Sequence, residues 1–90
     1  MKVLKLTIQG EVQGVGYCRW FKKTAVELGL KGYVKNLATG EVEAVIVGNE
    51  QDILKMIQQS YIGPISSNVE SITQTELELD QHYLDFEMIR

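Results

Sequence analysis

Hydrophobic and polar residues alternate near the start of this 90-residue chain and then change to a helical spacing. Within residues 3–9 the alternation is typical of a strand with one buried face. The apolar positions of that face are Leu4, Leu6 and Ile8. From about Cys18 the interval lengthens to three or four residues, which predicts an amphipathic helix. Its apolar positions are Phe21, Ala25 and Leu28, and Gly29 is placed to end it.

The middle of the chain predicts a hairpin followed by a second helix. Residues 31–36 and 42–47 are extended segments, and the Ala-Thr-Gly stretch at 38–40 is a turn between them. Asn49 or Asp52 is expected to cap a helix that runs to about Tyr61. Its buried face is expected at Ile53, Met56, Ile57 and Ser60.

The last third reads as extended chain after a break at Gly63-Pro64. We expect a strand over residues 69–79, a polar turn at 80–82 and a short strand over 84–89. The order β-α-β-β-α-β plus a terminal strand predicts an α+β, ferredoxin-like split βαβ sandwich. In that fold one antiparallel sheet carries two helices on one face, and residues 1–90 form a single domain.

Composition excludes several classes of protein. The chain is 44% hydrophobic and 23% charged, as in soluble globular proteins. It has one cysteine and no Cys/His spacing typical of zinc sites, so neither a disulfide framework nor a metal is expected. No apolar stretch approaches the ~20 residues of a membrane-spanning helix. We therefore expect a cytoplasmic monomer with no membrane partner.

Charge is distributed unevenly along the chain. Residues 1–40 hold seven Lys/Arg and two Asp/Glu, a net charge of +5. Residues 41–90 hold two Lys/Arg and ten Asp/Glu, a net charge of −8. A positive half within an acidic protein favours a local anion site over nucleic-acid binding. Tyr17 and Tyr33 could stack on bases, but the later strands are too acidic for an RNA-binding sheet.

The most informative stretch is Gly10-Glu11-Val12-Gln13-Gly14-Val15-Gly16-Tyr17, a glycine-rich loop between a strand and a helix start. Main-chain N–H groups at a helix N-terminus have no intrahelical partner, and the helix dipole is positive there. Such a loop can bind a phosphate closely. It can equally be an ordinary tight connection whose glycines relieve backbone strain. The residues alone leave both interpretations open.

At this point the chain resembles the acylphosphatase family. One family signature, Gly-x-Val-Gln-Gly-Val-x-Phe/Tyr-Arg, is matched by residues 10–18 except at its last position. A second, Gly-aromatic-Val-Lys-Asn followed by Gly-x-Val, is matched by residues 32–36 and 40–42. The resemblance implies hydrolysis of the carboxyl–phosphate bond of small acyl phosphates, with no metal or organic cofactor. Inorganic phosphate or sulfate would bind in the same place.

The resemblance also implies roles for individual residues. The main-chain N–H groups of the loop would hold the phosphoryl oxygens, and the carboxamide of Asn36 would orient the attacking water. The implied phosphate-binding residues are Gln13, Gly14, Val15, Gly16, Tyr17 and Cys18. The implied catalytic positions are Cys18 and Asn36.

The chain departs from the family at Cys18, which stands where the family has its phosphate-binding arginine. A thiol supplies neither the charge nor the planar donors of a guanidinium. Arg19 is expected to point elsewhere, since helical neighbours are rotated by about 100°. We therefore expect weak or impaired hydrolysis. The alternative is a non-catalytic anion-binding module of the same fold.

Three side-chain expectations complete the sequence analysis. The Cys18 thiol either has a lowered pKa at the helix N-terminus, which would make the site redox-tuned, or is an inert, partly buried residue. Trp20 and Phe21 are expected in the core. His82 has no partner in sequence and is expected in a solvated loop.

Overall fold

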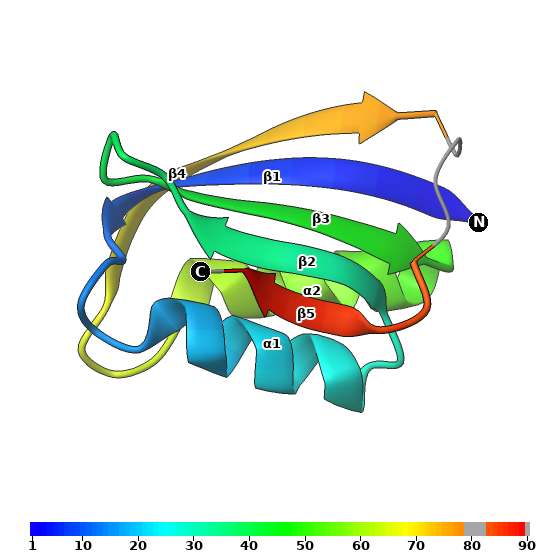
Figure 1. The fold of residues 1–90 in the computed structure, drawn as a ribbon, viewed down its shortest axis with the longest axis horizontal. Helices are drawn as coiled ribbons and strands as arrows, with labels where there is room; N and C mark the ends of the chain where they lie inside the picture. The colour runs from blue at the N-terminus through cyan, green and yellow to red at the C-terminus, as the bar shows by residue number, and fades with distance from the viewer. Residues whose placement is uncertain (79–82, 90) are drawn as a thin grey trace.

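Five strands form one sheet in the order β4-β1-β3-β2-β5, and two helices lie on one side of it (Figure 1). The computed structural model describes residues 1–78 and 83–89. The elements are β1 (Lys2–Glu11), α1 (Tyr17–Glu27), β2 (Lys31–Asn36), β3 (Val42–Gly48), α2 (Glu50–Ile62), β4 (Asn68–Leu77) and β5 (Phe86–Ile89). The ferredoxin-like fold predicted from the sequence is confirmed, as is the hairpin between β2 and β3.

β1 and β3 are the neighbouring strands at the centre of the sheet, and their alternation explains their burial. Leu6 pairs with Ala44 in the antiparallel register of β1 and β3, and both are fully buried on the side of the helices. Successive side chains of a strand point to opposite faces. Val3, Val45 and Val47 accordingly form a second, smaller buried cluster.

The two ends of α1 are built differently. At its C-terminus Gly29 has φ 73°, its N–H donates to the Val26 carbonyl at 3.0 Å, and the Leu30 N–H donates to the Ala25 carbonyl at 2.9 Å. This pair of bonds is a Schellman motif, and it confirms the end predicted at Gly29. At its N-terminus the cap residue is Gly16, and no side chain caps the helix.

α2 begins and packs as its sequence predicts. Asn49 is its N-cap, and the Asn49 side chain accepts the Asp52 N–H at 2.9 Å. A left-handed Gly63 with φ 64° follows the last residue of the helix. The buried residues of the helix are the four predicted ones, Ile53, Met56, Ile57 and Ser60.

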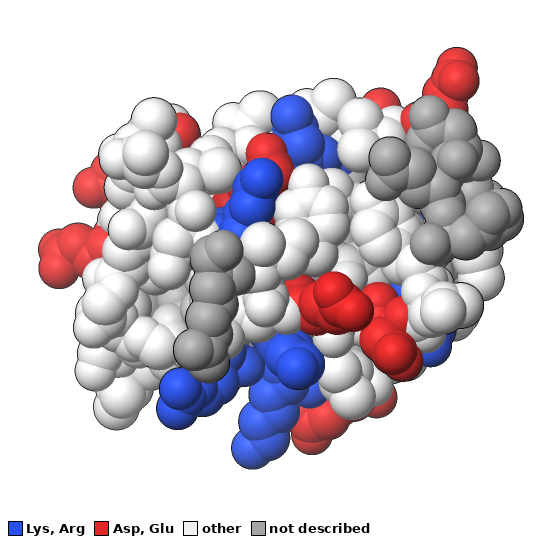
Figure 2. Space-filling view, in the orientation of Figure 1, with Lys and Arg blue, Asp and Glu red and all other residues white. Residues whose placement is uncertain are grey.

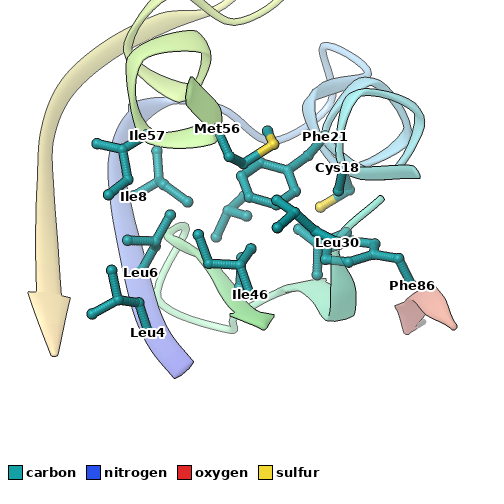
Figure 3. Packing of buried hydrophobic residues seen from close by; sticks show 14 of the residues in the cluster. Leu4, Leu6, Ile8, Cys18, Phe21, Leu30, Ile46, Met56, Ile57 and Phe86 are labelled. Atoms are coloured by element: carbon teal, nitrogen blue, oxygen red, sulfur yellow. The ribbon is translucent and has the colours of Figure 1, made fainter. Parts of the chain in front are cut away.

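The main core fills the layer between the helices and the sheet. Figure 3 shows Phe21 and Met56 from the two helices meeting Ile46 from the sheet. The rings of Phe21 and Phe86 lie 5.8 Å apart, so the last strand is held against α1 by aromatic packing. Phe21 is fully buried and Trp20 packs against this core from a half-buried position, as predicted.

The sheet is mixed, which corrects the expectation of a wholly antiparallel one. β5 pairs in parallel with β2, with Val34 opposite Met88. β4 lies at the opposite edge and runs antiparallel to β1, so the chain reverses direction as it crosses to β5. That reversal gives β5 the direction of β2. The predicted turn at 80–82, with His82, and the predicted strand end at Leu79 lie outside the described residues.

No helix within residues 1–78 and 83–89 has the length and apolar character needed to cross a membrane.

Candidate functional site

The loop between β1 and α1 has a backbone conformation that only glycine adopts easily. Gly14 and Gly16 have φ values of 75° and 78°, and no other residue type in the described chain has a positive φ. A Cβ built on either glycine would meet nothing within 4 Å. Glycine is therefore required by the left-handed backbone and not by lack of space. Alternation of left- and right-handed residues is the geometry in which successive N–H groups form a concave anion site.

The N-terminus of α1 leaves its donors free. The first backbone hydrogen bond of the helix runs from the Trp20 N–H to the Gly16 carbonyl at 3.0 Å. The N–H groups of Gly16 through Arg19 have no acceptor among the residues the structure describes. The N-cap is Gly16, which supplies no side-chain cap, and the first turn holds no acidic residue. No cap side chain and no acidic residue of the first turn therefore compensates the partial positive charge of this helix end.

A hollow of about 230 Å³ adjoins this helix end. Residues distant in sequence border it: Val12, Gly14, Gly16, Tyr17, Cys18, Arg19, Asn36 and Met88. Asn36 is the last residue of β2, and β2 lies beside α1 in the sandwich (Figure 1). The fold therefore places the carboxamide predicted to act on water next to the loop predicted to bind phosphate.

Cys18 and Asn36 touch directly. The thiol of Cys18 donates to Oδ1 of Asn36 at an Sγ···Oδ1 distance of 3.3 Å. Cys18 is buried, and Figure 3 shows its side chain in the core layer beneath α1. Burial raises the pKa of the thiol, which is opposite to the lowering expected at a helix N-terminus. With its pKa raised by burial, the group at this position is a neutral S–H at neutral pH.

The side chain of Tyr17 belongs to the core. Its ring is 1% exposed and lies 5.4 Å from that of Trp20. Its hydroxyl donates to the Ser60 carbonyl at 2.8 Å, tying the start of α1 to the end of α2. Burial raises the pKa of this phenol. What Tyr17 offers the hollow is its main-chain N–H, and its ring is too buried to stack on a base.

Gln13 has a side-chain role that the sequence did not reveal. Its Nε2 donates to the carbonyls of Leu37 and Glu41, at 2.8 and 2.9 Å. These acceptors lie 24 and 28 positions away, in the turn that follows Asn36. No local periodicity could have found this contact. The implied role of Gln13 in binding phosphate falls to its main chain, because its carboxamide is engaged with the turn.

Arg19 is exposed but adjoins the hollow, which surrounds the first turn of α1. It is the first of three exposed cations on this helix, with Lys22 and Lys23. Figure 2 shows Lys and Arg side chains gathered over the edge of the molecule where α1 lies. In the described part of the chain Arg19 has no acidic partner within 4.0 Å. One unpaired cation therefore stands beside the site.

The sheet carries a further hollow away from α1. A hollow of about 300 Å³ on the other face of the sheet is lined by Val3, Lys5, Tyr33, Val45, Leu77, Glu78 and Tyr83, none of which the sequence singled out for phosphate chemistry. The described residues contain no group of three or more His, Cys, Asp or Glu side chains arranged to hold a metal ion.

Comparison with known proteins identifies the family. The acylphosphatase family model matches residues 4–88. This chain belongs to the acylphosphatase family. It is 42% identical over 82 residues to an acylphosphatase of Methanocella arvoryzae, covering 91% of this chain and 93% of that protein.

Solved acylphosphatase structures have the same fold. The crystal structure of the acylphosphatase from Bacillus subtilis superposes with a TM-score of 0.96 at 28% identity, covering all of both chains. The acylphosphatase from Coxiella burnetii gives 0.93 at 33% identity, covering 98% of this chain and 92% of that one. The family membership inferred from two sequence motifs is confirmed.

Proposed function

We propose that this chain hydrolyses the carboxyl–phosphate bond of small acyl phosphates, giving a carboxylate and inorganic phosphate, at a rate limited by Cys18. The observation that carries the proposal is one hollow bordered by free main-chain donors at the start of α1 and by Asn36 at the end of β2. Relatives named acylphosphatase support the reaction class.

The reaction needs little acid–base chemistry from the protein. A carboxylate leaving group has a pKa of about 4, so it departs without a general acid. Phosphoryl transfer is then catalysed mainly by positioning and by stabilising charge on the phosphoryl oxygens. The oxygen of a water attacks phosphorus, the bond from phosphorus to the acyl oxygen breaks, and the water's proton passes to a phosphoryl oxygen. No metal or organic cofactor enters these steps.

Each part of the hollow has a role in that scheme. The N–H groups of the loop from Gln13 to Cys18 hold the phosphoryl oxygens, and the left-handed backbone of Gly14 and Gly16 shapes the loop around them. The carboxamide of Asn36 orients the attacking water. These donors are fixed before substrate arrives, so they stabilise the developing charge without reorganisation.

Cys18 weakens this machinery. A neutral, buried thiol contributes no charge to the phosphoryl group and cannot make the paired N–H bonds of a guanidinium. Loss of one such cationic group costs about 10²–10⁵ in rate in comparable enzymes. Arg19 beside the hollow supplies positive charge without occupying the position of the lost arginine.

A second candidate function is favoured by the same thiol. If turnover has been lost altogether, the loop still binds phosphate or sulfate, and the chain is an anion-binding module. This candidate predicts saturable phosphate binding with no hydrolysis.

Hydrolysis of benzoyl phosphate separates the two. The wild-type chain is compared with Cys18→Arg and with the double variant Cys18→Arg/Asn36→Ala. We expect slow hydrolysis by the wild type, a gain of at least 10²-fold in Cys18→Arg, and loss of that gain in the double variant. Equal rates in the wild type and Cys18→Arg would overturn the proposed role of Cys18. Undetectable hydrolysis by the wild type, together with phosphate binding, would favour the anion-binding module.

A further inference from the structure

Three hydrogen bonds, donated by two side chains, join the phosphate loop and the start of α1 to the segment that carries Asn36. In the first, the Cys18 thiol donates to Oδ1 of Asn36 at 3.3 Å. The other two are donated by the Gln13 carboxamide to the carbonyls of Leu37 and Glu41, at 2.8 and 2.9 Å. All three cross from one half of the site to the other, and none of them uses Nδ2 of Asn36 or a main-chain N–H of the loop.

The first bond selects an orientation of the Asn36 carboxamide. Asn36 is exposed, and the terminal torsion of an asparagine is broad and roughly two-fold, so a free carboxamide would present either end to the hollow. The Cys18 thiol takes one lone pair of Oδ1. Nδ2 of Asn36 has no partner among the described residues and remains available at the border of the hollow. Because burial raises the pKa of the thiol, it keeps the proton that this bond needs at neutral pH.

The two bonds of Gln13 fix the backbone next to Asn36. Two backbone hydrogen bonds close the turn after β2. The Leu37 N–H donates to the Glu41 carbonyl at 2.8 Å, and the Gly40 N–H donates to the Leu37 carbonyl at 3.1 Å. Gln13 adds a second donor to each of these two carbonyls, using both of their lone pairs. The phosphate loop and the turn are thereby held together, and Asn36 is the residue directly before that turn.

We propose that Cys18 and Gln13 are positioning residues for Asn36: the thiol fixes which end of the carboxamide faces the hollow, and Gln13 fixes the turn that follows it. The effect on turnover rests on the proposed function, but the positioning itself does not. Cys18 thus has a role of its own in place of the arginine's role.

Order in the Asn36 side chain tests the proposal without any substrate. The ¹⁵N order parameter of Nδ2 of Asn36 is measured in the wild type, Cys18→Ala, Cys18→Ser, Gln13→Ala and Gln9→Ala. Gln9 is the matched control, because its Nε2 donates to the side chain of Glu41 at 2.6 Å and not to the backbone of the turn. Far-UV circular dichroism and melting curves show that each variant is folded.

In the wild type we expect an order parameter of about 0.8, falling below about 0.6 in Cys18→Ala. The serine variant keeps a donor at that position and should restore the wild-type value, which a mere packing role for sulfur would not. Gln13→Ala should also lower the value, and Gln9→Ala should leave it unchanged. A wild-type order parameter in Cys18→Ala or in Gln13→Ala would overturn the role of that residue. The order parameter is measured without turnover. The positioning proposal can therefore be overturned while benzoyl phosphate is still hydrolysed, and the proposed hydrolysis can fail while Asn36 is still positioned.

Discussion

Cys18 and Asn36 are 18 positions apart in sequence, and their side chains meet at 3.3 Å beside the free end of α1. Cys18 lies in the first turn of that helix and Asn36 at the end of β2. The pairing places a neutral thiol where the family has a cation, against the residue proposed to orient water.

The Cys18 thiol should react slowly. Because burial raises its pKa, the thiolate fraction at a given pH is smaller than for a free cysteine, and the reaction should keep accelerating as pH rises beyond the usual range. Iodoacetamide labelling followed by mass spectrometry from pH 7 to 10 measures this, with the unfolded chain in guanidinium as the control. Labelling of the folded chain at pH 7 as fast as that of the unfolded chain would show an activated thiolate instead.

Gly16→Ala should weaken phosphate binding and destabilise the fold. A left-handed alanine costs about 1–2 kcal/mol, and relief of that strain turns the loop donors away from the anion. Loss of one N–H bond to a charged ligand corresponds to roughly a tenfold weaker affinity. Isothermal titration with inorganic phosphate and urea unfolding measure the two effects.

Gly29→Ala is the matched control for that experiment. Gly29 has φ 73° and open space around its missing Cβ, as Gly16 has, but it lies at the other end of α1. It should lose similar stability and keep the phosphate affinity of the wild type. An equal loss of affinity in the two variants would indicate a general effect of destabilisation and not a local anion site.

Tyr17→Phe should lower the free energy of unfolding by about 1–3 kcal/mol, because the Ser60 carbonyl would lose its only described side-chain donor in a buried place. The Ser60 carbonyl belongs to the last turn of α2, where intrahelical donors run out. Urea unfolding measures the change, and Tyr61→Phe, at a half-exposed tyrosine, is the control. Equal stability of the two variants would show that the bond contributes nothing.

Most of the fold could be predicted because its signals are local. The alternation in β1 and the helical spacing of Ile53, Met56 and Ile57 report burial directly, and Asn49 lies at the cap position its chemistry favours. The parallel pairing of β5 with β2 could not be predicted in this way, since it depends on the edge of the sheet and the direction that the chain takes after β4. Local pattern gives element types, whereas strand direction follows from the whole topology.

The site could be predicted only in part, for a related reason. The loop glycines and Asn36 were found from motifs, and the structure brings them to one hollow. The hydrogen bonds of the Gln13 carboxamide join residues 24 and 28 positions apart, so no local sequence pattern predicts them. For Cys18 the sequence left two outcomes open, a lowered pKa or an inert, partly buried thiol, because it shows a helix N-terminus but does not show how deeply the thiol is buried beneath it.

The central claim is that main-chain donors before and within the first turn of α1 bind the phosphoryl group. A ¹H–¹⁵N titration of the wild-type chain with inorganic phosphate tests it most directly. We expect the largest saturable shifts at the N–H groups of residues 14–19 and at the side-chain amide of Asn36. Shifts confined to the exposed lysines of α1, or no saturable shift in the loop, would contradict the account.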